Sequence, residues 1–140
     1  MGTHISGDYR PSEDDPYMNP EQLEYFRIKL LRWRNQLLKE LNEILDHLKE
    51  NLKEPETLDQ GIVETDTAFK IKTSNRYRKL INKINDALER IEDGTYGYCE
   101  ETGKEIGIKR LEVRPIATLC IEAQEKHERI ERRNRAGYRI

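Results

Sequence analysis

The sequence predicts a mainly α-helical protein, with a long antiparallel coiled-coil hairpin, a small zinc-finger-like globular head and a C-terminal helix. Hydrophobic residues make up 35% of the 140 residues and charged residues 37%. A single globule with this composition buries too little apolar surface, whereas long helices with one apolar stripe use the same residues well. Two long stretches, 21–54 and 62–93, contain neither glycine nor proline, and four glycines then crowd into 94–107.

The first helix is predicted from Pro20 to about residue 52. Asn19 supplies a capping side chain, Pro20 fits the first turn, and Glu21 lies near the positive end of the helix dipole. Apolar residues then recur in steps of three and four. They are Leu23, Phe26, Leu30, Trp33, Leu37, Leu41, Ile44 and Leu48, with a second register at Leu31, Leu38, Leu45 and Leu52. Trp33 fits this seam and is interpreted as core. Residues 1–19 are polar and are expected to form a flexible or loosely docked arm.

A second helix is predicted from about residue 62 to Asp93, after the breaker PETLDQG at 55–61. Its seam has heptad spacing. The seam residues are Tyr77, Leu80, Ile84, Ala87 and Ile91. Two helices of similar length joined by a short breaker fold back on each other, so 20–93 is expected to form a hairpin with its tip at about 54–61. Such a hairpin satisfies its own seam, which favours a monomer over a coiled-coil dimer.

The head is predicted at 94–117, with one of the chain's two cysteines, Cys99, inside these bounds and the other, Cys120, just after them. The glycines there indicate short loops with a possible β-hairpin, and 118–140 is expected to form a C-terminal helix and tail. The spacing Cys99-x2-Thr102, seventeen residues, then Cys120-x2-Ala123 resembles a four-cysteine zinc motif in which two positions carry no thiolate. Since a structural zinc site needs four ligands, the prediction is two buried cysteines in a head that folds without zinc.

Several function classes are disfavoured by composition. The net charge of −2 provides no general attraction to nucleic acid, so sequence-specific DNA binding is not expected. No apolar run is long enough to span a membrane, and residues 1–15 have no signal-peptide core. Two cysteines without an export signal favour the reducing cytoplasm. No nucleophile–base pair, phosphate loop or complete metal set is apparent, so the protein is not expected to be an enzyme or to bind a cofactor tightly.

A basic stripe is predicted on the second helix. Lys72, Arg76, Lys79 and Lys83 follow one another in steps of four, three and four, and no acidic residue lies between Lys70 and Lys83. A solvated helix face usually mixes charges. The unmixed stripe therefore favours an acidic protein surface or a phosphate ligand as its partner, and chance clustering on a solvated face remains the alternative.

Three segments of the chain carry a resemblance to a known family: GYCEETGKEIGIKRLEVRPIATLCIEA (97–123), YMNPEQLEYFRIKLLRWRNQL (17–37) and RKLINKI (78–84). Together they resemble the DksA/TraR family of RNA polymerase-binding regulators. With Thr102 and Ala123 at two cysteine positions, the chain is similar to members that lack zinc cysteines. The resemblance implies that the hairpin enters the secondary channel of RNA polymerase and modulates promoter open complexes, with guanosine tetraphosphate, in the stringent response.

The resemblance also implies site residues. The family's tip motif Asp-x-x-Asp-x-Ala aligns with Glu56-x-x-Asp59-x-Gly61, and these residues together with Lys72, Arg76 and Lys79 are expected to contact polymerase. Lys83 and Arg114 match basic residues that bind guanosine tetraphosphate, whereas a third family lysine is replaced by Gln124. Two further alternatives remain: a direct DNA-binding factor, and a secondary-channel competitor or transcript-cleavage-type factor with an acidic tip.

Overall fold

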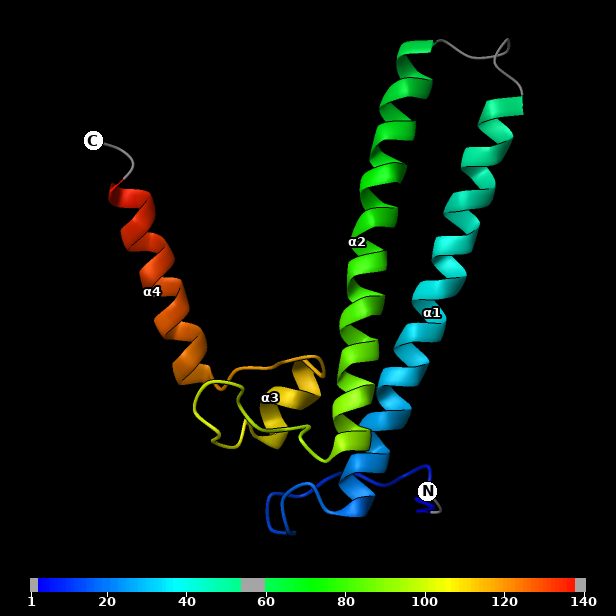
Figure 1. The fold of residues 1–140 in the computed structure, drawn as a ribbon. Coiled ribbons are helices and arrows are strands. Elements are labelled where there is room, and N and C mark those ends of the chain that lie inside the picture. Colours follow the sequence, from blue (N-terminus) through cyan, green and yellow to red (C-terminus); the bar gives the residue numbers. More distant parts are fainter. Residues whose placement is uncertain (1–2, 54–59, 138–140) are drawn as a thin grey trace. The chain divides into compact units, whose positions relative to one another are not determined.

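The computed structural model describes residues 3–53 and 60–137, without the side chains of 52–64. This part of the chain contains four helices: α1 (Pro20–Lys53), α2 (Gln60–Asp93), α3 (Ile108–Val113) and α4 (Ile121–Gly137) (Figure 1). The chain divides into two compact units, one of residues 28–88 and one that joins Met1–Arg27 to Glu89–Ile140. The prediction of a mainly helical fold with a long helical hairpin is confirmed.

Within residues 28–88, α1 and α2 run side by side as a hairpin (Figure 1). The buried apolar side chains of this unit are at positions that the three-and-four spacing predicts. They are Leu30, Leu37, Leu41, Ile84 and Ala87. The second register is less buried, because Leu38 is exposed. The apolar stripe is therefore close to the narrow seam of a coiled coil.

The start of α1 is fixed by side-chain hydrogen bonds of Asn19 and Gln22. The helix begins at Pro20, and the Asn19 side-chain oxygen accepts the backbone N–H of Gln22 at 2.8 Å. Gln22 is fully buried. Its side-chain oxygen accepts the N–H of Met18 at 2.8 Å, and its side-chain nitrogen donates to the carbonyl of Ser12 at 3.0 Å. One buried amide thus fixes the chain that precedes the helix.

The N-terminal segment is attached to the head by Tyr17. Its hydroxyl donates to the Gly97 carbonyl at 2.6 Å and accepts the Gly107 N–H at 3.0 Å. Gly97 has a φ of 91°, and a Cβ on it would lie 2.9 Å from the Met18 side chain. Only glycine allows this approach. Tyr17 and Met18, which belong to the segment 1–19 that the sequence predicts as a flexible or loosely docked arm, therefore carry specific contacts to 97–107.

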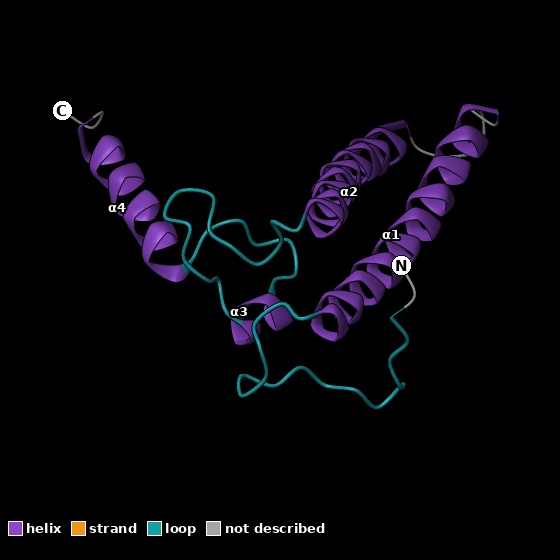
Figure 2. Cartoon of the chain, turned by 60° about the horizontal axis from the view of Figure 1, so that its bottom comes forward, coloured by secondary structure: helices purple, strands orange, loops and turns teal. Residues whose placement is uncertain are grey.

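The head consists mostly of loops around α3 (Figure 2). Among the described residues the possible β-hairpin is reduced to one isolated antiparallel bridge between Tyr98 and Glu105. The Cys99 N–H donates to the Lys104 carbonyl at 2.8 Å, and the Gly103 N–H donates to the Cys99 carbonyl at 2.9 Å. These bonds close a tight turn directly after the bridge, which leaves no length for a strand.

The last helix, α4, is attached to the head only at its first turns. Ala123 is its one buried residue, and each residue from Glu125 to Gly137 is exposed. In the described part of the chain, none of the helices combines the length and apolar character needed to cross a membrane.

Candidate functional site

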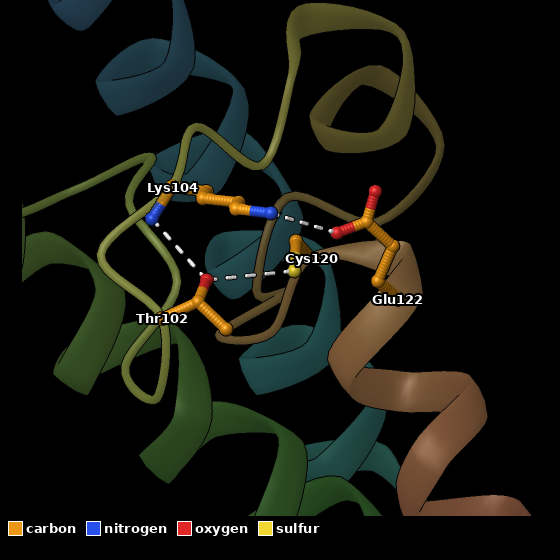
Figure 3. Close-up of polar contacts among 4 residues, drawn as sticks. All are labelled: Thr102, Lys104, Cys120 and Glu122. Carbon is orange, nitrogen blue, oxygen red and sulfur yellow. Dashed lines mark hydrogen bonds and ion pairs between the residues drawn. The ribbon is translucent and has the colours of Figure 1, made fainter.

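Three of the four positions of the predicted cysteine motif, Cys99, Thr102 and Cys120, lie together. Cys99 and Cys120 are 3% and 5% exposed, and Ala123, in α4, is also buried. Figure 3 shows the Thr102 hydroxyl directed at the Cys120 sulfur, with Oγ1 and Sγ separated by 3.7 Å. Thr102 Oγ1 also accepts the Lys104 N–H at 3.2 Å. The spacing therefore correctly brings both cysteines to one place, which is called the two-cysteine site below.

The environment of Cys99 stabilises a thiolate. Burial raises the pKa of its thiol, whereas a hydrogen bond from the Thr102 side chain lowers it. The backbone N–H groups of Glu101, Thr102 and Cys120 donate to the same sulfur and lower the pKa further, to about 6. Backbone donors directed at one sulfur are also the arrangement that supports a metal-bound thiolate.

The two-cysteine site does not fit a tetrahedral zinc ion. Structural zinc takes four ligands, drawn from thiolate, imidazole and carboxylate groups. Here the other two motif positions carry a hydroxyl, at Thr102, and a methyl group, at Ala123. No cluster of three or more histidine, cysteine or acidic side chains is suited to a metal within residues 3–53 and 60–137.

Two ion pairs connect the loop of the two-cysteine site to α4. Lys104 Nζ lies 3.3 Å from Glu122 Oε2 (Figure 3), and His127 Nε2 pairs with Glu101 Oε1. Sequence reasoning missed both pairs, because Glu101 and Lys104 are two charged residues among many in the chain.

A second candidate surface is the basic stripe of α2. Lys72, Arg76, Lys79 and Lys83 are all exposed, as their spacing predicts. None of the four forms an ion pair with another described residue, whereas Lys70 next to the stripe is paired with Asp66 at 2.8 Å. These cations are thus available to an external partner.

A third feature is a cavity of about 550 Å³ beside α3. Its walls include Val113 and Ile121, which are 82% and 58% exposed, and the basic residues Lys109 and Arg114. Arg114, the predicted ligand-binding residue, is itself exposed. Sequence reasoning missed this cavity, since its residues belong to 106–121 and Glu13 and share no periodic pattern.

The predicted tip is only partly within the described chain. Glu56 and Asp59 lie outside the described residues, and Gly61 is the second residue of α2.

Comparison with known proteins decides the family. The model of the DnaK suppressor protein DksA N-terminal domain matches residues 22–91, and that of the prokaryotic dksA/traR C4-type zinc finger matches 94–129. The chain belongs to the DksA/TraR family. The hairpin and the head correspond to these two family domains in order.

Relatives match over most of the chain. The RNA polymerase-binding transcription factor DksA of Caulobacter vibrioides (strain NA1000 / CB15N) is 56% identical over 129 residues, 91% of each chain. Its Escherichia coli (strain K12) counterpart is 40% identical over 117 residues, 83% of this chain and 78% of that protein. The solved structure of transcription factor DksA2 from Pseudomonas aeruginosa is similar with a TM-score of 0.79 and 40% identity, covering 83% of this chain and 90% of that chain.

The zinc-finger match qualifies one sequence-based expectation. The head is a zinc-finger domain of the C4 type by family, although only Cys99 and Cys120 occupy cysteine positions. Family membership alone therefore does not place the chain in a subgroup without zinc, and the family description favours a metal that the residues of the two-cysteine site do not fit.

Proposed function

We propose that this protein binds RNA polymerase directly, through the secondary channel, and regulates transcription at promoter open complexes without enzymatic activity. The family membership and the names of the relatives support the choice of partner. The observation that carries the proposal is the exposed basic stripe of α2, whose four cations lack ion-pair partners among the described residues. Such a partner implies a cytoplasmic protein that acts as a monomer, without sequence-specific DNA or membrane binding.

The stripe is suited to an acidic channel wall. Its four side chains lie on the same face of the helix, because steps of four, three and four residues match the helical repeat. Unpaired exposed cations complement an acidic surface and accelerate encounter with it. Arg76 additionally lies over the Tyr77 ring, 5.5 Å from its centroid, which restrains the guanidinium in place.

The head adds a second contact of different chemistry. The cavity beside α3 combines exposed apolar side chains, Val113 and Ile121, with the cations Lys109 and Arg114. An apolar cavity with a basic rim fits a protein surface in which a bulky side chain lies next to carboxylates. We assign this surface to the outer rim of the channel.

The tip is proposed to act on the open complex rather than to anchor the protein. Glu56, Asp59 and Gly61 are few and offer little apolar surface, so we expect them to contribute little binding energy. Asp59→Asn removes a charge at almost constant volume. It should leave polymerase occupancy unchanged while abolishing the effect on open-complex lifetime, measured by competition binding and promoter-complex decay.

Guanosine tetraphosphate is proposed as a ligand of the polymerase-bound protein, through Lys83 and Arg114. Both side chains are exposed cations, and phosphate oxygens accept charge-assisted hydrogen bonds from such groups. Gln124 replaces the family's third lysine, so we expect a weaker response than in relatives that keep it. In vitro transcription from a ribosomal promoter with and without the nucleotide tests this.

The head is proposed to fold without stoichiometric zinc. The Thr102 hydroxyl and the Ala123 methyl group stand where two ligands would be needed, and the Cys120 sulfur is already in contact with Thr102. Elemental analysis should find much less than one zinc per chain, and chelation should leave the circular dichroism spectrum unchanged. One tightly held zinc, with loss of structure on chelation, would contradict this.

The central experiment is charge reversal on the stripe. Arg76→Glu and Lys79→Glu should weaken polymerase binding by at least about tenfold, since rim and channel charges act on both association and dissociation. Arg78→Glu is the matched control, because Arg78 is equally exposed but lies on another face of α2. Equal affinity of all three variants and the unchanged protein would mean that the stripe is only a solvated face.

A channel competitor or cleavage-type factor is the alternative, in which an acidic tip supports metal-dependent hydrolysis of the transcript. Stalled elongation complexes distinguish the two functions. The proposed regulator leaves the RNA intact, whereas a cleavage factor shortens it.

A further inference from the structure

We propose that the two-cysteine site binds one monovalent soft metal ion, Cu(I), between the sulfurs of Cys99 and Cys120. This inference rests on the proposal that the head folds without zinc, and it is independent of polymerase binding. The observation behind it is that the family's metal position keeps two converging buried sulfurs although the other two ligand positions carry Thr102 and Ala123.

The two sulfurs converge on one hydroxyl group. Thr102 forms a side-chain hydrogen bond to Cys99, and its Oγ1 lies 3.7 Å from Cys120 Sγ (Figure 3). The hydroxyl can donate to one sulfur while it accepts from the other. The backbone N–H of Cys120 also donates to Cys99 Sγ, so both cysteines contact each other directly as well as through Thr102.

An ion can enter without disrupting the head. Thr102 is exposed although both cysteines are buried, so its side chain can rotate into solvent without loss of core packing. That rotation withdraws its hydroxyl from the Cys120 sulfur and opens that position to an ion. The backbone donors to Cys99 belong to the turn at 99–104 and remain in place.

The number of donors selects the ion. Zinc requires four ligands, and neither a hydroxyl nor a buried methyl group supplies the missing thiolates. Cu(I) is a soft ion that prefers thiolate ligands and is satisfied by two of them. A hard ion such as Mg²⁺ or Ca²⁺ needs oxygen ligands in larger number. Within the described residues, no acidic or histidine side chain joins the two cysteines to make such a set.

The charge of the bound state is also supported. Two thiolates and one Cu(I) carry a net charge of −1, which is costly in a buried site unless donors face it. The N–H groups of Glu101, Thr102 and Cys120 directed at Cys99 Sγ provide these donors. Binding displaces the thiol protons into solvent, so the affinity should increase as pH rises.

The test is a Cu(I) competition titration of the full, reduced chain against the chromophoric chelator bicinchoninate, under anaerobic conditions. The expected result is one Cu(I) withdrawn per chain. Cys99→Ser and Cys120→Ser should each lower the affinity by more than about a hundredfold, beyond the 10–100-fold that a change next to a ligand costs. Thr102→Val, which removes only the hydroxyl, should keep binding within about tenfold.

A second measurement guards against a folding defect in the serine variants. Thiolate-to-copper charge-transfer absorption in the near ultraviolet should appear in the unchanged chain at one equivalent and saturate there. Failure of the unchanged chain to withdraw Cu(I), or equal withdrawal by a folded Cys120→Ser chain, would overturn the proposal.

Zinc provides the matched comparison and separates this inference from the one it rests on. The unchanged chain should not retain zinc, whereas the double variant Thr102→Cys with Ala123→Cys should retain one zinc per chain. Tight zinc binding by the unchanged chain would contradict the zinc-free head and, with it, the selection of Cu(I) by two donors.

Discussion

The two compact units of this protein are stabilised in different ways. The hairpin unit, 28–88, depends on one repeated feature, an apolar residue at every third or fourth position of two helices. The unit formed by 1–27 and 89–140 depends on single contacts between residues far apart in sequence. Tyr17 binds both Gly97 and Gly107, and the Tyr96 hydroxyl donates to the Pro115 carbonyl at 2.8 Å.

The two units are therefore expected to tolerate substitutions to different degrees. In a periodic seam, each residue contributes a similar share, and an exposed position such as Arg76 can be adapted to a partner at little cost. In the head, loss of the Tyr17 hydroxyl leaves the Gly107 N–H without a partner and removes one of the two hydrogen bonds to the Gly97 carbonyl. The surface proposed to bind polymerase thus lies mainly on the tolerant unit, whereas the two-cysteine site lies in the unit that is sensitive to substitution.

The largest expected effect is from Phe26→Ala. Phe26 is fully buried, and its ring lies 5.2 Å from that of Tyr25 and 5.7 Å from that of Tyr96. Removing it should lower the free energy of unfolding by about 3–5 kcal/mol. Urea unfolding should be followed by tyrosine near-ultraviolet circular dichroism, which reports mainly on the head, and by the fluorescence of Trp33, the single tryptophan, which lies in the hairpin unit.

The tyrosine and tryptophan signals report separately on the unfolding of the two units. Independent units predict that the tyrosine transition moves to lower urea while the Trp33 transition stays in place. Coincident transitions in both proteins would mean that the units unfold together, and the contrast between them would then concern packing and not stability.

The two units also differ in how much of their structure can be predicted from the sequence. The start of α1 at Pro20 follows from the capping signals around it. The buried seam through Ile84 and the exposure of Lys79 and Lys83 follow from helical periodicity, which is also a local property of the sequence. The convergence of Cys99 and Cys120 followed from a motif.

The contacts of Tyr17 could not be predicted, because they join residues about eighty and ninety positions apart, and no periodic pattern marks them. Because residues 1–19 are mostly polar, the sequence predicts a flexible or loosely docked arm there. Bulky residues such as Tyr9, Tyr17 and Met18 in that polar stretch are the signal that could have indicated its attachment.

The second prediction uses alkaline pH. Burial, the largest cause, raises the pKa of Tyr96 above its usual value of 10 in the folded state. In the unfolded chain the phenol ionises first, so this contribution to stability is fully present below pH 10 and is lost as pH rises. The slope should approach about 1.4 kcal/mol per pH unit for one such group. Urea unfolding at a series of pH values should show the slope, and Tyr96→Phe should lack it; an identical slope in both chains would assign it to other groups.

The third prediction concerns Tyr17→Phe, which removes one oxygen and no apolar contact. The Gly107 N–H loses its partner, and the Gly97 carbonyl keeps only the Ile106 N–H at 2.8 Å, at an expected cost of about 1–3 kcal/mol. Urea unfolding measures it, and hydrogen exchange at the Gly107 amide provides a local check. Tyr98→Phe is the control, since Tyr98 is partly exposed and its ring contact with Tyr17, at 5.5 Å, does not depend on its hydroxyl. Wild-type stability of the Tyr17 variant would mean that water replaces the phenol.

The smallest effect is expected from removing a hydrogen bond within the hairpin, although it is about as short as those of Tyr17. Arg34 Nη1 donates to Asn85 Oδ1 at 2.7 Å, between α1 and α2, in a solvent-exposed position. Arg34→Ala should change the free energy of unfolding by no more than about 0.5 kcal/mol, because water replaces both partners at no desolvation cost. Asn85→Ala should behave alike, and the double variant should show a coupling below about 0.5 kcal/mol. A loss as large as that of Tyr17→Phe would contradict the proposed difference between the units: it would mean that the hairpin, too, depends on particular polar contacts, and that substitutions on its basic stripe cannot be assumed to leave the fold intact.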